Sequence, residues 1–272
     1  MRINHIMLVA AACLCIAGCK SSTTYPKIKS IEVQYPSRAA YTETFSFRYD
    51  SEGRLTQVEQ CAVYDGEKHM SSWKYAYNPN ELKATAESKL WSRSRTGEML
   101  FQDDYSHVVS YSLPEETEMD EYGIVFLGQL WECTYDAGRL TRCVFSDFTS
   151  DGMDISKLTW DEDGELLKYE GSDPSVFTEI KDIEYLESDN PFAGPDPVAF
   201  AMGISPFYWQ GLAGPRPSHL VGGYTHVASD PWVEDVSIDH IAITYENDLD
   251  GRISHILQTV NGILEKVVII SY

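Results

Sequence analysis

Residues 45–59 read FSFRYDSEGRLTQVE, and this stretch decides the fold because it contains a whole β-hairpin. Its aromatic residues occupy every second position, which is the period of a strand with one buried face and one wet face. Asp50 can open a turn through its own side chain, and Gly53 supplies the positive φ that closes a type I turn with a bulge. The residues that follow predict the returning strand.

Altered copies of this hairpin recur along the chain. The aromatic residues Tyr135, Trp160 and Tyr185 end three arriving strands at intervals of 25 residues. A propeller blade needs ~40 residues for its four strands, so each interval here holds a single hairpin. The repeats therefore predict an all-β fold, an antiparallel meander in one strongly twisted, barrel-like sheet. The copies are Trp73–Tyr77, Trp131–Thr141, Leu158–Leu166, Ile183–Tyr185 and Ile241–Ile253.

The strand face opposite the aromatic residues is polar. A membrane-spanning barrel would need an apolar band there, in contact with lipid. The sequence therefore predicts a sheet whose outer face is exposed to water. The residues that indicate this are Arg48, Lys74, Glu132, Lys157 and Thr244.

Residues 187–234 interrupt the repeats with a loop rich in Pro and Gly. We expect a short helix there between Val198 and Leu212, interrupted by Pro206. Long inserts in compact domains often carry function. Two interpretations remain open: the aromatic residues of the insert plug an open end of the sheet, or they form a platform for a sugar or a peptide. The candidate ligand-binding residues are Phe207, Tyr208, Trp209 and Trp232.

The N-terminus predicts export and lipidation. Residues 1–18 combine a basic Arg2 with a short apolar core, as in a signal peptide. The following Cys19 completes a sequence that resembles a bacterial lipobox, although an ordinary secretory signal with a chance cysteine is the alternative. We expect lipid attachment to the membrane at Cys19, a tether over residues 19–27 and a single all-β domain over residues 28–272. The absence of an acidic residue after Cys19 favours the outer membrane, on either leaflet.

The charge balance excludes one class of partner. The chain has 21 Lys and Arg against 42 Asp and Glu, a net charge of −21. A surface this acidic repels phosphate backbones, so no nucleic-acid partner is expected. Calcium binding that stabilises the structure is one explanation for the charge, and solubility is another.

Three cysteines remain in the predicted mature domain: Cys61, Cys133 and Cys143. We expect buried apolar fillers, because an odd number allows one disulfide at most. With Asp136-Ala137-Gly138 as the turn, Cys133 and Cys143 would be diagonal neighbours, too far apart to bridge easily.

Catalytic and metal motifs are not found in the sequence. There is no GxSxG, no HExxH and no Gly-rich phosphate loop, and no cofactor or metal is implied. Residues 161–164 and 248–251 are similar to calcium loops, but both coincide with predicted hairpin turns. Paired carboxylates for glycoside hydrolysis remain an alternative, because acidic residues are abundant.

The lipobox, the repeated aromatic-x-Tyr-Asp-x-x-Gly-Arg-Leu hairpins and the late insert ending near Ser218-His219-Leu220 resemble a family of Bacteroidetes lipoproteins, domain of unknown function 4595. The hairpins are also similar to the YD repeats of Rhs-type toxins, whose shells are far longer. The family resemblance implies a porin-like fold and an envelope location, and it brings no assigned activity. The leading hypothesis is a non-enzymatic binding or assembly module, for a glycan or a peptide. A glycan-active hydrolase and a calcium-stabilised structural protein are the alternatives.

Overall fold

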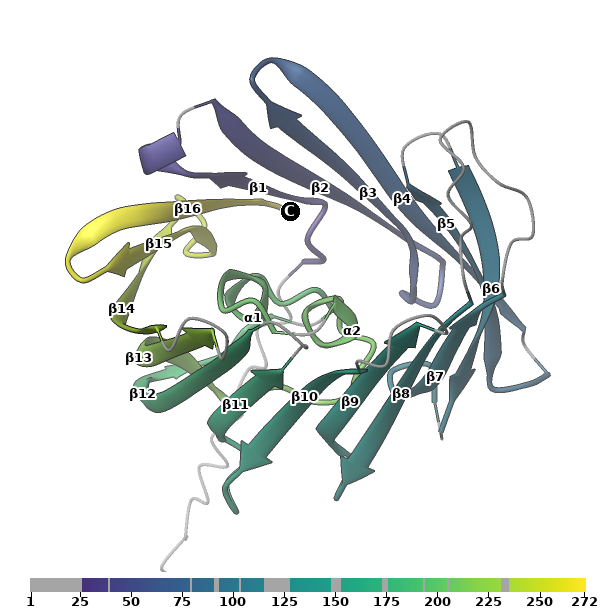
Figure 1. Cartoon of the computed structure of the whole chain (residues 1–272). Helices are drawn as coiled ribbons and strands as arrows, with labels where there is room; N and C mark the ends of the chain where they lie inside the picture. The colour runs from purple at the N-terminus through teal and green to yellow at the C-terminus, as the bar shows by residue number, and fades with distance from the viewer. Residues whose placement is uncertain are drawn as a thin grey trace, which may run out of the picture.

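The protein is a closed antiparallel β-barrel (Figure 1). The structure, a computed structural model, describes residues 26–38, 40–78, 80–90, 93–102, 104–114, 128–147, 153–172, 176–192, 194–204, 206–230 and 235–272. Each strand pairs with its neighbours in sequence, and β1 pairs with β16 to close the ring. This confirms the predicted all-β meander. The strands are β1 (Ser30–Gln34), β2 (Tyr41–Tyr49), β3 (Leu55–Tyr64), β4 (Glu67–Asn78), β5 (Lys83–Leu90), β6 (Arg93–Phe101), β7 (Val108–Leu113), β8 (Gln129–Asp136), β9 (Arg139–Asp147), β10 (Met153–Trp160), β11 (Leu166–Ser172), β12 (Phe177–Asp189), β13 (His219–Asp230), β14 (Asp235–Asn247), β15 (Ile253–Val260) and β16 (Ile263–Ser271).

Two short helices, α1 (Pro197–Ala201) and α2 (Pro206–Trp209), lie inside the ring of strands (Figure 1). They belong to the predicted insert, which is shorter than residues 187–234. Its first residues continue β12, and residues 219–230 form β13. A 3-10 helix, η1 (Pro36–Arg38), follows β1. Across the described residues, no helix has the length and apolar character needed to cross a bilayer.

Polar contacts hold the insert against the barrel wall. The buried Asp196 caps α1 by accepting hydrogen bonds from two backbone N–H groups of its first turn, and its carboxylate lies 3.4 Å from Arg216. At the other end of α1, Lys266 on β16 donates a hydrogen bond of 2.9 Å to the carbonyl of Ala201. Burial lowers the pKa of Lys266. Directly after α2, Gln210 accepts a hydrogen bond of 2.8 Å from the Tyr75 hydroxyl of β4.

The strands alternate as the sequence predicts. Phe45 and Phe47 on β2 are 3% and 5% exposed, whereas Arg48 beside them is exposed. Ion pairs join outward residues of neighbouring strands, such as Lys74 with Glu87 at 3.9 Å. The outward residues named in the sequence prediction are all exposed: Arg48, Lys74, Glu132, Lys157 and Thr244.

The hairpin turns have the predicted chemistry. Asp50 Oδ1 accepts hydrogen bonds from the backbone N–H groups of Glu52 and Arg54, and Gly53 has a φ of 84°. Asp248 makes the same contacts with Asp250 and Arg252. The carboxylates that are similar to calcium ligands in sequence therefore stabilise turns, as predicted.

An aromatic hydrogen-bond ring joins each repeat to the one before it. The aromatic side chain near the end of an arriving strand donates a hydrogen bond to the carbonyl at or near the start of the preceding strand, so neighbouring repeats are tied together at one end of their strands. At β6 the strand ends in Phe101, which has no hydroxyl, and Tyr105 takes the role by donating to Glu81. The other donors and acceptors, at 2.7 to 2.9 Å, are Tyr49 to Ile28, Tyr77 to Leu55, Tyr135 to Val108, Trp160 to Leu140, Tyr185 to Leu166, Tyr245 to Val221 and Tyr272 to Ile253.

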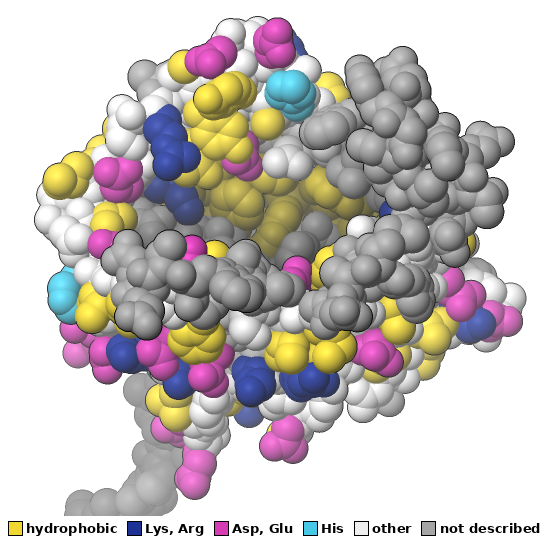
Figure 2. Space-filling view, viewed as in Figure 1, with side chains coloured by type: hydrophobic (Ala, Val, Ile, Leu, Met, Phe, Trp, Pro, Cys, Tyr) yellow, Lys and Arg dark blue, Asp and Glu magenta, His cyan; other side chains and the backbone are white. Residues whose placement is uncertain are grey.

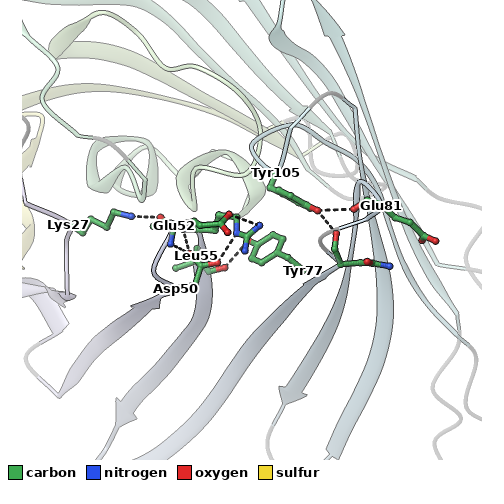
Figure 3. A network of polar contacts seen from close by, with 10 residues as sticks. Lys27, Asp50, Glu52, Leu55, Tyr77, Glu81 and Tyr105 are labelled. Carbon is green, nitrogen blue, oxygen red and sulfur yellow. Dashed lines mark hydrogen bonds and ion pairs between the residues drawn. The ribbon is translucent and has the colours of Figure 1, made fainter.

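Arginine side chains of the repeats lie over the rings of some of these aromatic residues and form cation–π contacts. Arg54 lies over the ring of Tyr77 at 4.9 Å and over Tyr105 at 5.0 Å (Figure 3). Arg252 lies over Tyr272 in the last repeat. The Gly-Arg-Leu part of the motif therefore supplies both a cation for the ring and a carbonyl for the hydroxyl.

The pairing of two cysteines differs from the prediction. Cys133 on β8 lies directly opposite Cys143 on β9 rather than diagonally. The turn residues are Ala137 and Gly138, both with positive φ, and Asp136 already pairs with Arg139. A bulge then shifts the register of the pair, and the combined shift brings the two cysteines opposite each other. The expected diagonal offset was wrong because it assumed a regular register after the turn, without the shift between Thr134 and Tyr135.

A candidate ligand-binding chamber inside the barrel

A cavity of about 480 Å³ lies between one side of the barrel wall and the two internal helices. In Figure 2 a hollow opens in the centre of the face and hydrophobic side chains form its floor. Its wall comes from strands β2, β3, β4, β5, β7 and β8, and its inner side from α1, α2 and the adjoining Gln210. We call this cavity the aromatic chamber. Its lining residues are Glu43, Phe45, Gln60, Trp73, Tyr75, Ser88, Tyr111, Leu113, Gln129, Trp131, Phe200, Phe207, Trp209 and Gln210.

Strand register brings the aromatic residues of the wall together. Trp73 on β4 is the cross-strand partner of Ser88 on β5, and Tyr111 on β7 is the partner of Trp131 on β8. Side chains at paired positions point to the same face of a sheet, which here is the interior. The period of two in the sequence is thus what lines the chamber with rings.

The rings pack in edge-to-face and stacked arrangements. On one side, Phe45 meets Trp209 of α2 edge-on at 5.4 Å. On the other side, Tyr111 stacks on Trp131 with ring centroids 5.0 Å apart, and Phe207 of α2 contacts both rings edge-on. Such aromatic pairs are worth about 0.5–1.5 kcal/mol beyond burial. The chamber therefore has a rigid wall of ring faces and edges.

Two hydroxyl groups of the chamber have no hydrogen-bond partner among the described residues: Ser88 Oγ and Tyr111 OH. Their residues are 3% and 5% exposed. Burial raises the pKa of Tyr111, and the nearby hydroxyl of Ser88 offsets part of that rise, although the two oxygens do not meet hydrogen-bond geometry. A buried polar group without a partner destabilises a fold by about 1–3 kcal/mol. These two hydroxyls are therefore polar groups of the chamber lining that no described residue satisfies.

Amide and carboxylate groups supply further polar contacts at the chamber wall. Gln60 lies 3.4 Å from Glu43 through its side-chain nitrogen, and Gln129 accepts a hydrogen bond of 3.3 Å from Arg95. Glu43 also accepts a hydrogen bond from Tyr41. The chamber thus combines apolar ring surface with a few directed polar groups, as ligand sites in proteins do.

The candidate ligand-binding residues from the sequence are not all in one place. Phe207 and Trp209 line the chamber. Tyr208 between them is 1% exposed and packs towards Trp160 instead, with ring centroids 6.1 Å apart. Trp232 lies outside the described residues. Trp73 and Trp131 were not among the candidates, although their alternation with polar residues was a sign that they point inward.

A second cavity of about 440 Å³ adjoins the aromatic chamber at Trp131, which lines both. Its wall is richer in hydroxyl groups, and Ser156 Oγ lies 3.2 Å from the Tyr169 hydroxyl there. Gly171 also lines this cavity, so no side chain from that position occupies the space.

Among the described residues, no group of three or more His, Cys, Asp and Glu is placed to hold a metal ion. Glu43 is the carboxylate of the aromatic chamber, and Asp154 is that of the adjoining cavity. A glycoside hydrolase needs two carboxylates that face each other across the substrate. The described lining residues of these two cavities do not provide such a pair within either cavity.

Comparison with known proteins shows a likeness in fold. No family model matches the chain, and no curated protein matches it in sequence. A crystal structure of a porin-like protein from Bacteroides uniformis ATCC 8492 has a TM-score of 0.61 at 14% identity, and the match covers 91% of this chain and 99% of that one. A porin-like protein from Bacteroides vulgatus ATCC 8482 has a TM-score of 0.57 at 13% identity, with the same coverage.

Proposed function

We propose that this chain is a lipid-anchored protein of the bacterial cell envelope that binds a small amphipathic ligand, a glycan or a peptide segment, in the aromatic chamber. One observation carries the proposal. The chamber presents ring faces together with two buried hydroxyls, Ser88 and Tyr111, that have no partner among the described residues. Ring faces pack on the C–H surface of a sugar or on an apolar side chain, while the hydroxyls and amides bond to its polar groups.

The envelope location has two supports. The proteins with similar folds come from Bacteroides and are described as porin-like. The leader over residues 1–18, the lipobox cysteine Cys19 and the resemblance to the lipoproteins of domain of unknown function 4595 agree with that location. Acyl chains on Cys19 would hold the barrel at the outer membrane, facing the periplasm or the cell surface.

A binding role agrees better with the barrel than a pore does. The helices α1 and α2 lie inside the barrel, and their rings pack on its wall. On the outside, strand residues form ion pairs such as Lys168 with Glu179 at 2.7 Å. Charged groups on the lipid-facing side of a barrel are destabilising by about 2–4 kcal/mol at the bilayer midplane. We therefore place the barrel beside the membrane, not through it.

The experiment is a binding titration with the neutral fluorophore N-phenyl-1-naphthylamine, followed by displacement with hits from glycan and peptide arrays. A Ser88→Phe variant fills the chamber from β5. A Thr85→Phe variant is the matched control, because Thr85 lies on the same strand and is exposed. We expect the dye to bind wild type and Thr85→Phe alike and to bind Ser88→Phe at least tenfold more weakly.

Circular dichroism of both variants checks that the barrel remains folded. Equal dye affinity in the two variants, or array hits that bind without displacing the dye, would place the binding site elsewhere and refute the proposal.

A further inference from the structure

Two sulfur atoms face each other on neighbouring strands just outside the aromatic chamber, beside the adjoining cavity that Cys143 lines. Cys133 and Cys143 are directly paired on β8 and β9, and their Sγ atoms are 3.3 Å apart. We propose that these two cysteines form a cross-strand disulfide in the exported protein. The proposal rests on the envelope location proposed above, because disulfides form and persist in oxidising compartments.

The geometry needs little adjustment. A disulfide has an S–S length of about 2.05 Å and a Cβ–Cβ distance of ~3.5–4.5 Å, close to the spacing of directly opposite residues on antiparallel strands. Rotation of both side chains, with a slight approach of the two strands, therefore brings the sulfur atoms from 3.3 Å to bonding distance. The third described cysteine, Cys61, lies on β3 with strands β4 to β7 between it and β8. It does not compete for either partner in the folded barrel.

The chemistry indicates when the bond forms. Both side chains are buried, at 8% and 4% exposure. The contact with Cys143 and burial raise the pKa of the Cys133 thiol, so in the closed barrel it remains protonated and reacts slowly. Oxidation therefore belongs to the folding phase, when the β8–β9 hairpin has formed and the barrel is still open. The two cysteines are close in sequence, so this hairpin needs no distant contact.

The electrons go to an oxidant of the disulfide class, such as a thiol oxidase of the envelope or oxidised glutathione. The thiolate of one cysteine attacks the oxidant's disulfide, forming a mixed disulfide and releasing one oxidant thiolate. The thiolate of the second cysteine then attacks the mixed disulfide and releases the other. One S–S bond forms in the protein and two S–H bonds are lost, while the oxidant's disulfide is reduced and takes up the two protons, as a dithiol in a thiol oxidase or as two molecules of glutathione.

The bond would fix the hairpin that forms part of the binding wall. Trp131 on β8 and Phe145 on β9 are a cross-strand pair next to the cysteines, with ring centroids 4.6 Å apart. Trp131 lines both cavities. A disulfide here therefore holds β8 and β9 together and fixes the position of Trp131, whose ring lines both cavities.

The test is peptide mapping of the full-length protein, extracted from the envelope in mild detergent and alkylated under denaturing conditions. Trypsin separates the two cysteines, because Arg139 and Arg142 lie between them. We expect one linked pair of peptides carrying Cys133 and Cys143, which reductant splits, and an alkylated Cys61. A second arm unfolds the reduced protein and refolds it in a glutathione redox buffer, where we expect the same link and a higher melting temperature than for the reduced barrel.

Free Cys133 and Cys143 in the extracted protein would overturn the proposal. If the link also fails to form on oxidative refolding, the geometry is wrong; if it forms only there, the envelope premise is wrong. Cys61→Ser is the matched control and should keep the link, whereas a link that requires Cys61 contradicts the pairing. Because the readout is covalent, it is independent of whether the aromatic chamber binds a ligand.

Discussion

At the scale of single residues, the same side chain has two different roles in this barrel. Tyr77 donates a hydrogen bond of 2.7 Å to the carbonyl of Leu55, which stabilises a hairpin. Tyr111 is buried without a partner for its hydroxyl among the described residues. A satisfied hydroxyl contributes to folding, whereas an unsatisfied one lowers stability and is available to a ligand.

One substitution therefore has opposite effects at these two positions. We expect Tyr77→Phe to lower the free energy of unfolding by about 1 kcal/mol, because the Leu55 carbonyl loses its donor. Tyr111→Phe should raise it by a similar amount, about 1 kcal/mol, and weaken binding of an array hit. Urea denaturation with a ligand titration measures both. Destabilisation by Tyr111→Phe with unchanged binding would show that its hydroxyl has a structural partner.

At the scale of elements, the sequence predicted the hairpins, but it predicted only some of the contacts between their strands. Alternation and the Asp-x-x-Gly turn predicted most strands, because both depend on neighbouring residues. The strand β13 was missed, since Gly222 and Gly223 sit within it and prolines precede it. The cysteine pairing was missed because a bulge leaves no clear sequence signal. The recurring aromatic residues were seen, but their bonds to strand starts need coordinates.

The aromatic hydrogen-bond ring predicts how the barrel responds to alkali. Burial raises the pKa of Tyr49, Tyr77, Tyr135, Tyr185 and Tyr245 above the ordinary value near 10. The folded state thus keeps protons that the unfolded state releases, and stability present below pH ~10 is lost as the pH rises towards the raised values.

We therefore expect cooperative alkaline unfolding, in which most tyrosinate absorbance at 295 nm appears together with the loss of β-sheet circular dichroism. If all tyrosines ionise near pH 10 while the barrel remains folded, the tyrosines of the aromatic hydrogen-bond ring are not buried and the prediction is wrong.

At the scale of the whole molecule, closure and filling decide what the barrel can do. The sequence predicted a curled sheet, but pairing of β1 with β16 joins the two ends of the chain and cannot be read from local patterns. The same holds for the insert. Its aromatic residues suggested a plug or a platform, and the structure places Phe207 and Trp209 against the wall, where they line a cavity. The aromatic chamber is the space that remains between the barrel wall and the two helices inside the barrel.

The most direct test of this account is a crystal structure of the protein grown with a brominated N-phenyl-1-naphthylamine, with the bromine located by anomalous scattering. We expect a bromine peak inside a closed barrel, between Trp73 on the wall and Trp209 on α2. A peak on the outer face of the strands, or a barrel in which β1 and β16 are not paired, would contradict it.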